Sequence, residues 1–210
     1  MPLRSWPQLP TGQPWQWRLA MLPAGWLHAA SLAWPGHGAA LWWLQLLSLA
    51  LLCKALLAAP RRRDGALLGW LFGTSWLVGT FWWLFTSMHT YGGLAAPLAA
   101  AGVLALALFL ALYYAAVCAL FKHFSFTHRA VNALVFAACW LLAELARGVL
   151  WTGFPWGASG YAHISGLLFP LARWVGVYGI GAAAAGLAML LAQVRRSDLR
   201  DPKIWAMCGY

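Results

Sequence analysis

The sequence predicts an all-α integral membrane protein, a six-helix transmembrane bundle with both ends of the chain on the cytoplasmic side. The first observation is composition, because 63% of the 210 residues are hydrophobic and only 9% are charged, whereas soluble domains carry about 25% charged residues. The second is that apolar residues occur in runs of about 20, enough for a helix to cross a bilayer core. The third is that Lys and Arg cluster between these runs, as they do in cytoplasmic loops.

The first three expected helices follow directly from the N-terminal half of the chain. The first, about 19–34, is short and ends at the turn "WPGHG", which makes it a hairpin with the second, about 38–59. The third, about 65–86, begins after three consecutive arginines, Arg61 to Arg63. Gly69 and Gly73 form a GxxxG pattern on it, so we expect a neighbouring helix to approach closely there.

The other three expected helices lie at about 94–121, 130–150 and 166–192. A basic loop, Lys122 to Arg129, separates the fourth from the fifth. Pro170 and Arg173 interrupt the sixth, where Gly181 and Gly186 belong to small-residue pairs that favour close helix packing.

The distribution of basic residues predicts the orientation. With the N-terminus cytoplasmic, all Lys and Arg residues except Arg147 and Arg173 lie on the inner side or at its edge. They occupy the loops 60–64 and 122–129 and the two ends of the chain, together with Lys54 near the end of the second expected helix. The outer loops are then 34–38, 87–93 and 151–165. This divides the chain into a cytoplasmic segment 1–18, a bundle 19–192, and a segment 193–210 that is a cytoplasmic tail or the start of a further span.

Several function classes are excluded by composition and spacing. The net charge of +10 does not indicate a nucleic-acid partner, because the basic residues occupy loops between apolar runs. The four cysteines show no C-x-x-C spacing, and no phosphate-binding glycine loop or nucleophile elbow is present. We therefore expect no cofactor and no metal, and no soluble-enzyme active site.

Glu144 and Arg147 are the charges that most need an explanation. Glu144 is the one acidic residue inside an expected span, and Arg147 lies three residues later on the same helical face. A charge in a bilayer costs at least a few kcal/mol, so we expect the two to form an ion pair, with Arg147 also able to reach the interface. The pair is either a structural clamp or a polar site for a lipid headgroup or a substrate amine.

The loop "TGFPWGASGY" follows this pair directly. Pro155 restricts Phe154 to extended geometry, and Trp156 and Tyr161 combine apolar surface with a polar group. The loop is either an interfacial re-entrant turn that caps the helix or a wall of a lipid-binding cleft.

A second outer element is "FWWLFTSMHTYGG", which contains His89 and Tyr91. The pKa of histidine suits proton transfer, but a hydrogen-bonding surface role is the commoner one for a single interfacial histidine. A zinc site from His37, His89 and His163 is compatible with topology alone and has no supporting ligand spacing.

Four segments together resemble the membrane region of bacterial apolipoprotein N-acyltransferases in order and spacing: "FWWLFTSMHTYGG", "LLAELARG", "TGFPWGASGY" and "PLARWVGVYG". The resemblance covers roughly residues 20 to 192. It implies a multi-pass protein of the bacterial inner membrane that takes part in lipoprotein maturation, with phospholipid and diacylated lipoprotein as partners.

The resemblance also implies where the reactive groups are. In this family a periplasmic nitrilase-like domain carries the catalytic glutamate, lysine and cysteine, and no such region follows residue 192 here; Cys208 does not fit the nucleophile. We therefore assign no catalytic residue to this chain and expect it to be inactive alone, with a separate nitrilase-like domain as a further partner. The expected lipid-cleft residues are Glu144, Arg147, Phe154, Pro155, Trp156, Tyr161, His89, Tyr91, Gly92 and Gly93.

Two other functions stay open at this point. One is a non-catalytic lipid-binding or scaffolding membrane protein that has the bundle without the enzyme. The other is a small transporter in which Glu144 relays protons, although no second intramembrane acid continues a path.

Overall fold

A computed structural model describes residues 14–194, and every regular element in that range is a helix. The segments 1–13 and 195–210 lie outside the described residues, and with them most of the predicted end segments 1–18 and 193–210, including Cys208. Between the long helices lie a π-helix, Ser87–Tyr91, and short 3-10 turns at Leu150–Thr152, Ser159–His163 and Phe169–Leu171. The α-helices are α1 (Pro14–Leu32), α2 (Trp42–Ala58), α3 (Arg62–Thr80), α4 (Trp82–Thr86), α5 (Ala96–His123), α6 (Arg129–Val149) and α7 (Ala172–Ala192).

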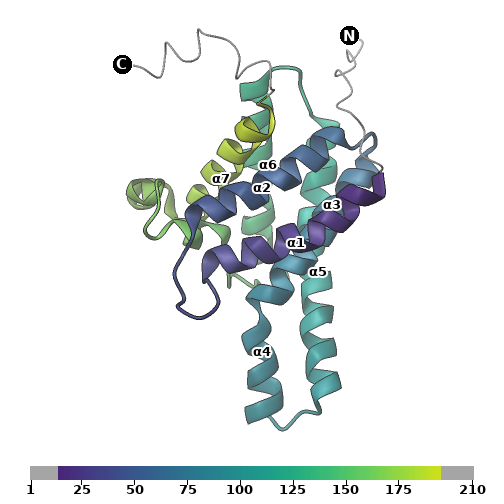
Figure 1. Cartoon of the computed structure of the whole chain (residues 1–210), viewed down its shortest axis with the longest axis vertical. Coiled ribbons are helices and arrows are strands. Elements are labelled where there is room, and N and C mark those ends of the chain that lie inside the picture. Colours follow the sequence, from purple (N-terminus) through teal and green to yellow (C-terminus); the bar gives the residue numbers. More distant parts are fainter. Residues whose placement is uncertain (1–13, 195–210) are drawn as a thin grey trace.

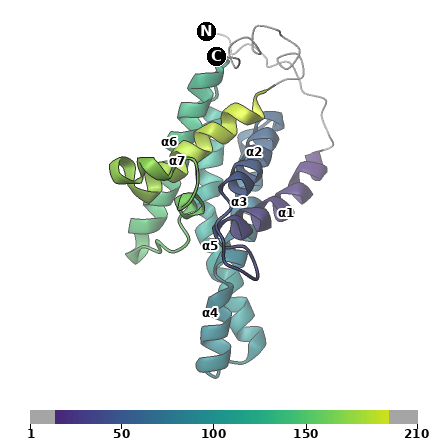
Figure 2. The ribbon, with the colours of Figure 1, turned by 60° about the vertical axis from the view of Figure 1, so that its left-hand side comes forward.

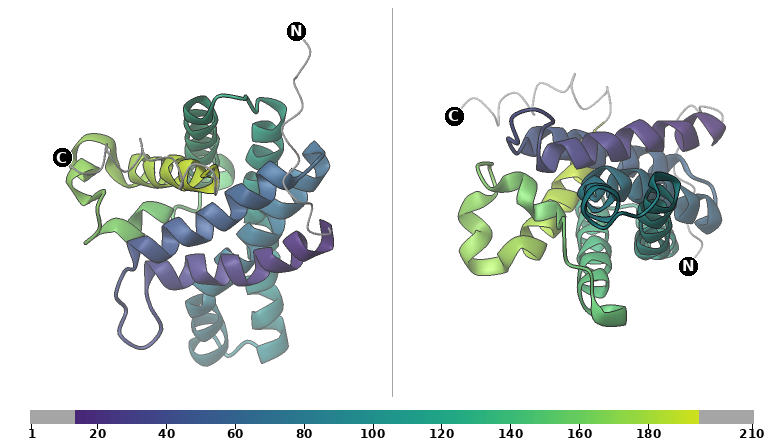
Figure 3. Two further views of the ribbon diagram at one scale, coloured as in Figure 1. Left: turned by 45° about the horizontal axis from the view of Figure 1, so that its top comes forward. Right: turned by 90° about the horizontal axis from the view of Figure 1, so that it is seen from below.

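The helices pack in two directions. Helices α3, α5 and α6 run along the long axis of the molecule, whereas α1 and α2 lie side by side and cross them obliquely (Figures 1 and 2). Figure 3 shows the α1–α2 pair covering one side of the bundle, with the segment after α6 at another side.

An aromatic cluster fills the centre of the bundle. Trp76 of α3 stacks on Trp140 of α6, with ring centroids 5.8 Å apart, and Tyr114 of α5 packs against both. Gly69 allows the close approach that the sequence predicts, because a Cβ there would lie 2.6 Å from the Tyr114 carbonyl oxygen. The GxxxG prediction for this helix is therefore confirmed, with α5 as the partner.

The structure confirms a helix at each of the six expected spans. It does not confirm that six helices cross the membrane. Within residues 14–194, three helical segments are individually long and apolar enough to cross a bilayer: 96–123, 129–152 and 169–192. A bent pair, 62–80 with 82–91, would be a fourth, and α2 is a shorter apolar helix. The helical membrane fold is thus supported, whereas the six-span count and the cytoplasmic ends stay predictions.

The third expected span is not one straight helix. It bends by 51° between α3 and the segment 82–91, around Phe81, whose backbone leaves helical geometry (φ −100°, ψ 14°). Beyond the bend, α4 and the π-helix pair with the start of α5 and project away from the other helices (Figure 1). We call residues 82–103 the projecting hairpin. The 28 residues of α5 span about 42 Å at 1.5 Å per residue, more than the roughly 30 Å bilayer core.

Candidate functional site

The chain turns back into the bundle directly after α6. Trp151 and Thr152 adopt the left-handed region, with φ of 57° and 79°, at a cost of about 1–3 kcal/mol each for non-glycine residues. At Gly153, also left-handed, an added Cβ would overlap the Gly148 carbonyl. The Phe154 amide then donates to the Arg147 carbonyl oxygen at 2.7 Å. We call residues 153–163 the re-entrant loop.

Glu144 and Arg147 do not form the ion pair that the sequence predicts. Both side chains are fully buried, yet neither has the other as a salt-bridge partner; the ion pair recorded within residues 14–194 joins Arg18 to Asp64. Instead, Glu144 Oε1 accepts a hydrogen bond from the Ser159 amide at 3.0 Å. The spacing predicted a shared helical face correctly, but each charge has a nearer partner in the loop.

The prediction that Arg147 can reach the membrane interface is also wrong. Its side chain binds carbonyl groups inside the protein. Its Nη1 donates to the carbonyl oxygens of Phe154 and Trp156, both at 2.7 Å. Its Nε donates to the Tyr114 hydroxyl of α5 at 3.1 Å. One guanidinium therefore connects α6, α5 and the loop, which suits its planar set of donors.

Ser159 lies where the loop is most deeply buried, and three side chains bind it. Its amide donates to Glu144, its hydroxyl accepts from Trp140 Nε1 at 3.1 Å, and its carbonyl oxygen accepts from Gln45 Nε2 of α2. Gly181 of α7 permits this approach, since a Cβ there would overlap the Ser159 hydroxyl oxygen.

Ser159 and Gln45 are functional residues that the sequence did not predict. The partners of Ser159 lie 15, 19 and 114 residues away in the sequence, so local spacing gives no indication of them. The small residues of "GASG", three of which are buried in the structure (Ala158, Ser159 and Gly160), were the available signal for a segment that enters the bundle.

The re-entrant loop and the base of the projecting hairpin form an aromatic wall. Phe154 packs edge-on against Phe81 with centroids 4.9 Å apart, and Trp156 lies 6.0 Å from Trp83. Trp156 remains 61% exposed, and Pro155 is exposed next to it. Tyr161 is exposed on the following 3-10 turn. The loop is thus anchored inside the bundle and presents apolar rings outside it.

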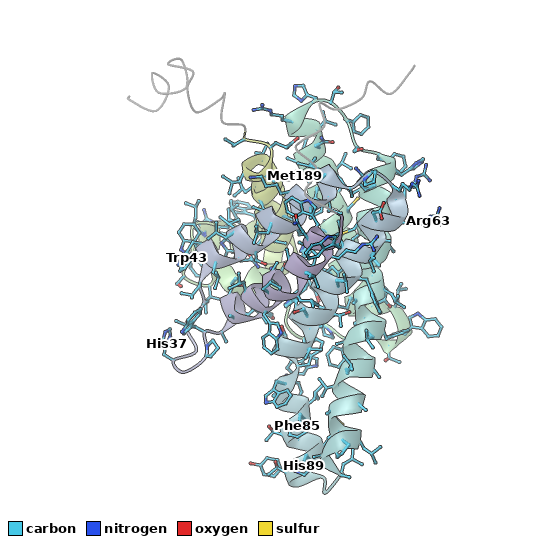
Figure 4. The ribbon with its side chains drawn as sticks, turned by 45° about the vertical axis from the view of Figure 1, so that its right-hand side comes forward. His37, Trp43, Arg63, Phe85, His89 and Met189 are labelled. Atoms are coloured by element: carbon cyan, nitrogen blue, oxygen red, sulfur yellow. The ribbon has the colours of Figure 1, made fainter. Side chains whose placement is uncertain are left out.

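The hairpin candidates lie apart from this wall. His89, Tyr91, Gly92 and Gly93 occupy the tip of the projecting hairpin, where Figure 4 labels His89. The His89 ring nitrogen Nδ1 is 2.8 Å from the Leu94 carbonyl oxygen, and the ring packs against Phe85. These contacts stay within the hairpin, so the structure divides the predicted residues into a buried anchor, an aromatic wall and the tip of the hairpin.

The three histidines considered for zinc are not brought together as a ligand set. No group of three or more His, Cys, Asp or Glu residues suited to a metal occurs among residues 14–194. Figure 4 places His37 in the α1–α2 connection, away from His89. His163 is buried beside Trp42, and burial lowers its pKa to about 4, so its imidazole is neutral at physiological pH.

Comparison with known proteins gives one consistent result. Residues 24–190 match the profile of the apolipoprotein N-acyltransferase N-terminal domain. The chain is 58% identical over 208 residues to the apolipoprotein N-acyltransferase of Verminephrobacter eiseniae, which covers 97% of this chain and 38% of that protein. It is 48% identical over 153 residues to the protein of the same name from Ralstonia nicotianae, a match that covers 71% of this chain and 29% of that protein. It is 41% identical over 201 residues to the apolipoprotein N-acyltransferase of Bordetella bronchiseptica, a match that covers 89% of this chain and 36% of that protein. The chain therefore spans less than two fifths of the length of these relatives.

Proposed function

Because the chain belongs to the apolipoprotein N-acyltransferase family, we propose that it forms the membrane region of an enzyme that acylates lipoproteins. The acyl chain would come from a phospholipid, and the acceptor would be the α-amine of a lipoprotein's N-terminal cysteine. The chain lies in the bacterial inner membrane as a multi-pass protein with a cytoplasmic N-terminus. The distribution of Lys and Arg supports that orientation.

Within this function, the described residues bind and orient substrates, and the covalent steps belong to the nitrilase-like domain. In the proposed reaction, the thiolate of that domain attacks the phospholipid ester, forming a thioester and releasing a lysophospholipid, and the lipoprotein amine then attacks the thioester, forming the amide and freeing the thiol. Both substrates are amphipathic, so their reactive groups lie at the membrane surface while their acyl chains lie in the bilayer. A wall of exposed aromatic rings at the outer surface suits such substrates, since these rings accept both apolar and polar neighbours.

One observation supports this proposal most: two buried charges of α6 bind the backbone of a single loop. Arg147 holds the carbonyl groups of Phe154 and Trp156, and Glu144 holds the amide of Ser159. Hydrogen bonds to charged groups contribute about 1.5–3 kcal/mol each to stability, whereas neutral ones contribute about 1 kcal/mol. We therefore assign Glu144 and Arg147 as positioning residues that fix the aromatic wall, and Phe154, Pro155, Trp156 and Tyr161 as the lipid-facing surface.

The two alternative functions are less well supported. A proton-relay transporter would need Glu144 to exchange protons along a path, but Oε1 is bound to a backbone amide. The other acid between residues 14 and 194 is Asp64, at the opposite end of the bundle in the first turn of α3. A purely lipid-binding protein would use the same aromatic wall, so an activity measurement must separate it from the enzyme.

A chimera provides that measurement. The chain would replace the matching region of the Verminephrobacter eiseniae relative, and the chimera would be expressed in a strain depleted of its own N-acyltransferase. We expect mass spectrometry of lipoprotein N-termini to show the triacylated product. A chimera present in the membrane at the level of the parent enzyme but without any product would instead favour the lipid-binding function.

A further inference from the structure

Three helices bring basic side chains to one corner of the bundle. Arg61, Arg62 and Arg63 lie at the start of α3 and are exposed, and Figure 4 labels Arg63 at the edge of the molecule. Arg18 of α1 reaches the same place, because its Nη2 lies 3.3 Å from Asp64 Oδ1. We call Arg18, Arg61, Arg62, Arg63 and Lys122 the basic corner.

Lys122 joins this group from the end of α5. Its Cγ would lie 2.8 Å from a Cβ built on Gly65, so the aliphatic part of the side chain packs against the first turns of α3. Lys122 is half-buried in this position. The corner therefore combines residues that are up to 104 positions apart in the sequence.

The basic corner has far more positive than negative charge. Asp64 is the one carboxylate among these five cations, and it is already bound to Arg18. The start of α3 adds to the positive potential, because Arg61 at the N-cap makes no side-chain capping hydrogen bond and the first amides of a helix favour an anion. Within residues 14–194, no carboxylate forms an ion pair with Arg61, Arg62 or Arg63.

An apolar strip leads away from the corner along α1. Leu19, Leu22 and Trp26 follow Arg18 at helical spacing and are 57%, 43% and 53% exposed. A group of cations at the end of an exposed apolar strip matches the shape of a phospholipid, whose phosphate would meet the arginines while an acyl chain follows the strip. A soluble anion would use the cations alone.

We propose that the basic corner binds the headgroup of an anionic phospholipid, such as phosphatidylglycerol. The site lies at the opposite end of the bundle from the aromatic wall and is separate from acyl transfer. It rests on the proposed orientation, which places this corner at the cytoplasmic leaflet, where anionic lipids attract basic segments. Bound there, the lipid would hold α1 and α5 against the start of α3.

Native mass spectrometry of the purified chain tests this proposal. The chain would be reconstituted in vesicles of phosphatidylcholine and phosphatidylglycerol and then released in detergent. We expect retained phosphatidylglycerol to exceed its share of the vesicle, and the double variant Arg62→Gln/Arg63→Gln to lower that enrichment by roughly fivefold per arginine. The variant Arg62→Lys/Arg63→Lys keeps the charge and should keep most of the enrichment. Arg173→Gln removes a charge far from the corner and should change nothing.

Three outcomes would overturn the proposal. One is retention of the two lipids in their vesicle ratio by the unchanged chain. The second is an equal loss of enrichment in Arg62→Gln/Arg63→Gln and Arg173→Gln, which would indicate a general charge effect. The third is displacement of the retained lipid by inorganic phosphate alone, which would indicate a simple anion site. None of these results depends on lipoprotein acylation, so the site and the proposed enzyme function can fail independently.

Discussion

Glu144 and Arg147 lie one turn apart on α6, both fully buried, and bind two different parts of the same loop. Arg147 holds the loop where it leaves α6, and Glu144 holds it where it is buried at Ser159. Two opposite charges so placed anchor a segment of irregular backbone whose polar groups would otherwise be unsatisfied inside a membrane protein.

Arg147→Gln should lower the free energy of unfolding by about 3 kcal/mol, because removing a buried charged partner leaves the other groups unpaired. Arg147→Lys should recover part of the loss, since one ammonium group cannot serve three acceptors on different sides. Unfolding of the purified chain in detergent measures both. Arg173→Gln removes an exposed arginine and should leave stability unchanged; an equal effect of all three variants would contradict the anchor.

Gly181 and Ser159 should show a strong coupling in a double-mutant cycle. Gly181→Ala places a methyl group on the Ser159 hydroxyl oxygen and should destabilise the protein by about 1–3 kcal/mol through overpacking. Ser159→Ala removes that oxygen and one hydrogen bond from Trp140, which costs about 1 kcal/mol. The double variant should be more stable than the sum of the two losses predicts, and simple additivity would show that the loop and α7 do not meet here.

How much of this was predictable from the sequence depends on the distance between partners. The helices were predictable, because each is an apolar run ended by glycine, proline or basic residues. The close contact at Gly69 was also predictable, because it followed from a local pattern. Trp156 and Tyr161 are exposed, and their role as a lipid-facing surface stays a prediction. The partners of Glu144 and Arg147 were not predictable, because i to i+3 spacing shows that two side chains share a face but not what lies opposite them.

The projecting hairpin was missed for a different physical reason. Residues 65–86 are mostly apolar and carry no charged side chain, so their hydropathy predicts one straight span, although the chain bends by 51° near Phe81. A bend of this kind depends on what packs against the helix, here the contact of Phe81 with Phe154. That contact joins residues 73 positions apart in the sequence, beyond the reach of any local pattern.

Stability should also depend on His163 as the pH falls. Burial lowers the pKa of His163 from 6.5 to about 4, so between these values the unfolded chain binds a proton that the folded chain does not. The part of the stability that depends on His163 is therefore fully present above pH 6.5 and decreases progressively as the pH falls towards 4. His163→Gln should flatten this part of the profile of unfolding against pH, whereas replacing the exposed His37 should not; a profile unchanged by His163→Gln would contradict a buried neutral imidazole.

Trp156→Ala should reduce acylation with little loss of stability, because this ring is 61% exposed and lies on the aromatic wall. In the chimera we expect roughly a tenfold lower yield of triacylated lipoprotein, the size of effect seen when a central aromatic contact is removed. Trp174→Ala removes another tryptophan, 74% exposed and outside the wall, and should have no such effect. Equal yields from the two variants would show that the wall has no particular role.

The most direct test of the anchored loop's role in the proposed function is the yield of triacylated lipoprotein from the chimera carrying Arg147→Gln, compared at equal amounts of membrane-inserted protein. Arg147 is buried and is assigned no substrate contact, so it acts through the groups that it holds in place, the re-entrant loop and Tyr114 of α5. We predict a yield at least about tenfold below that of the unchanged chimera, since small displacements of positioning groups cost that much or more in rate. An undiminished yield would contradict the claim that the anchored loop forms part of the substrate site.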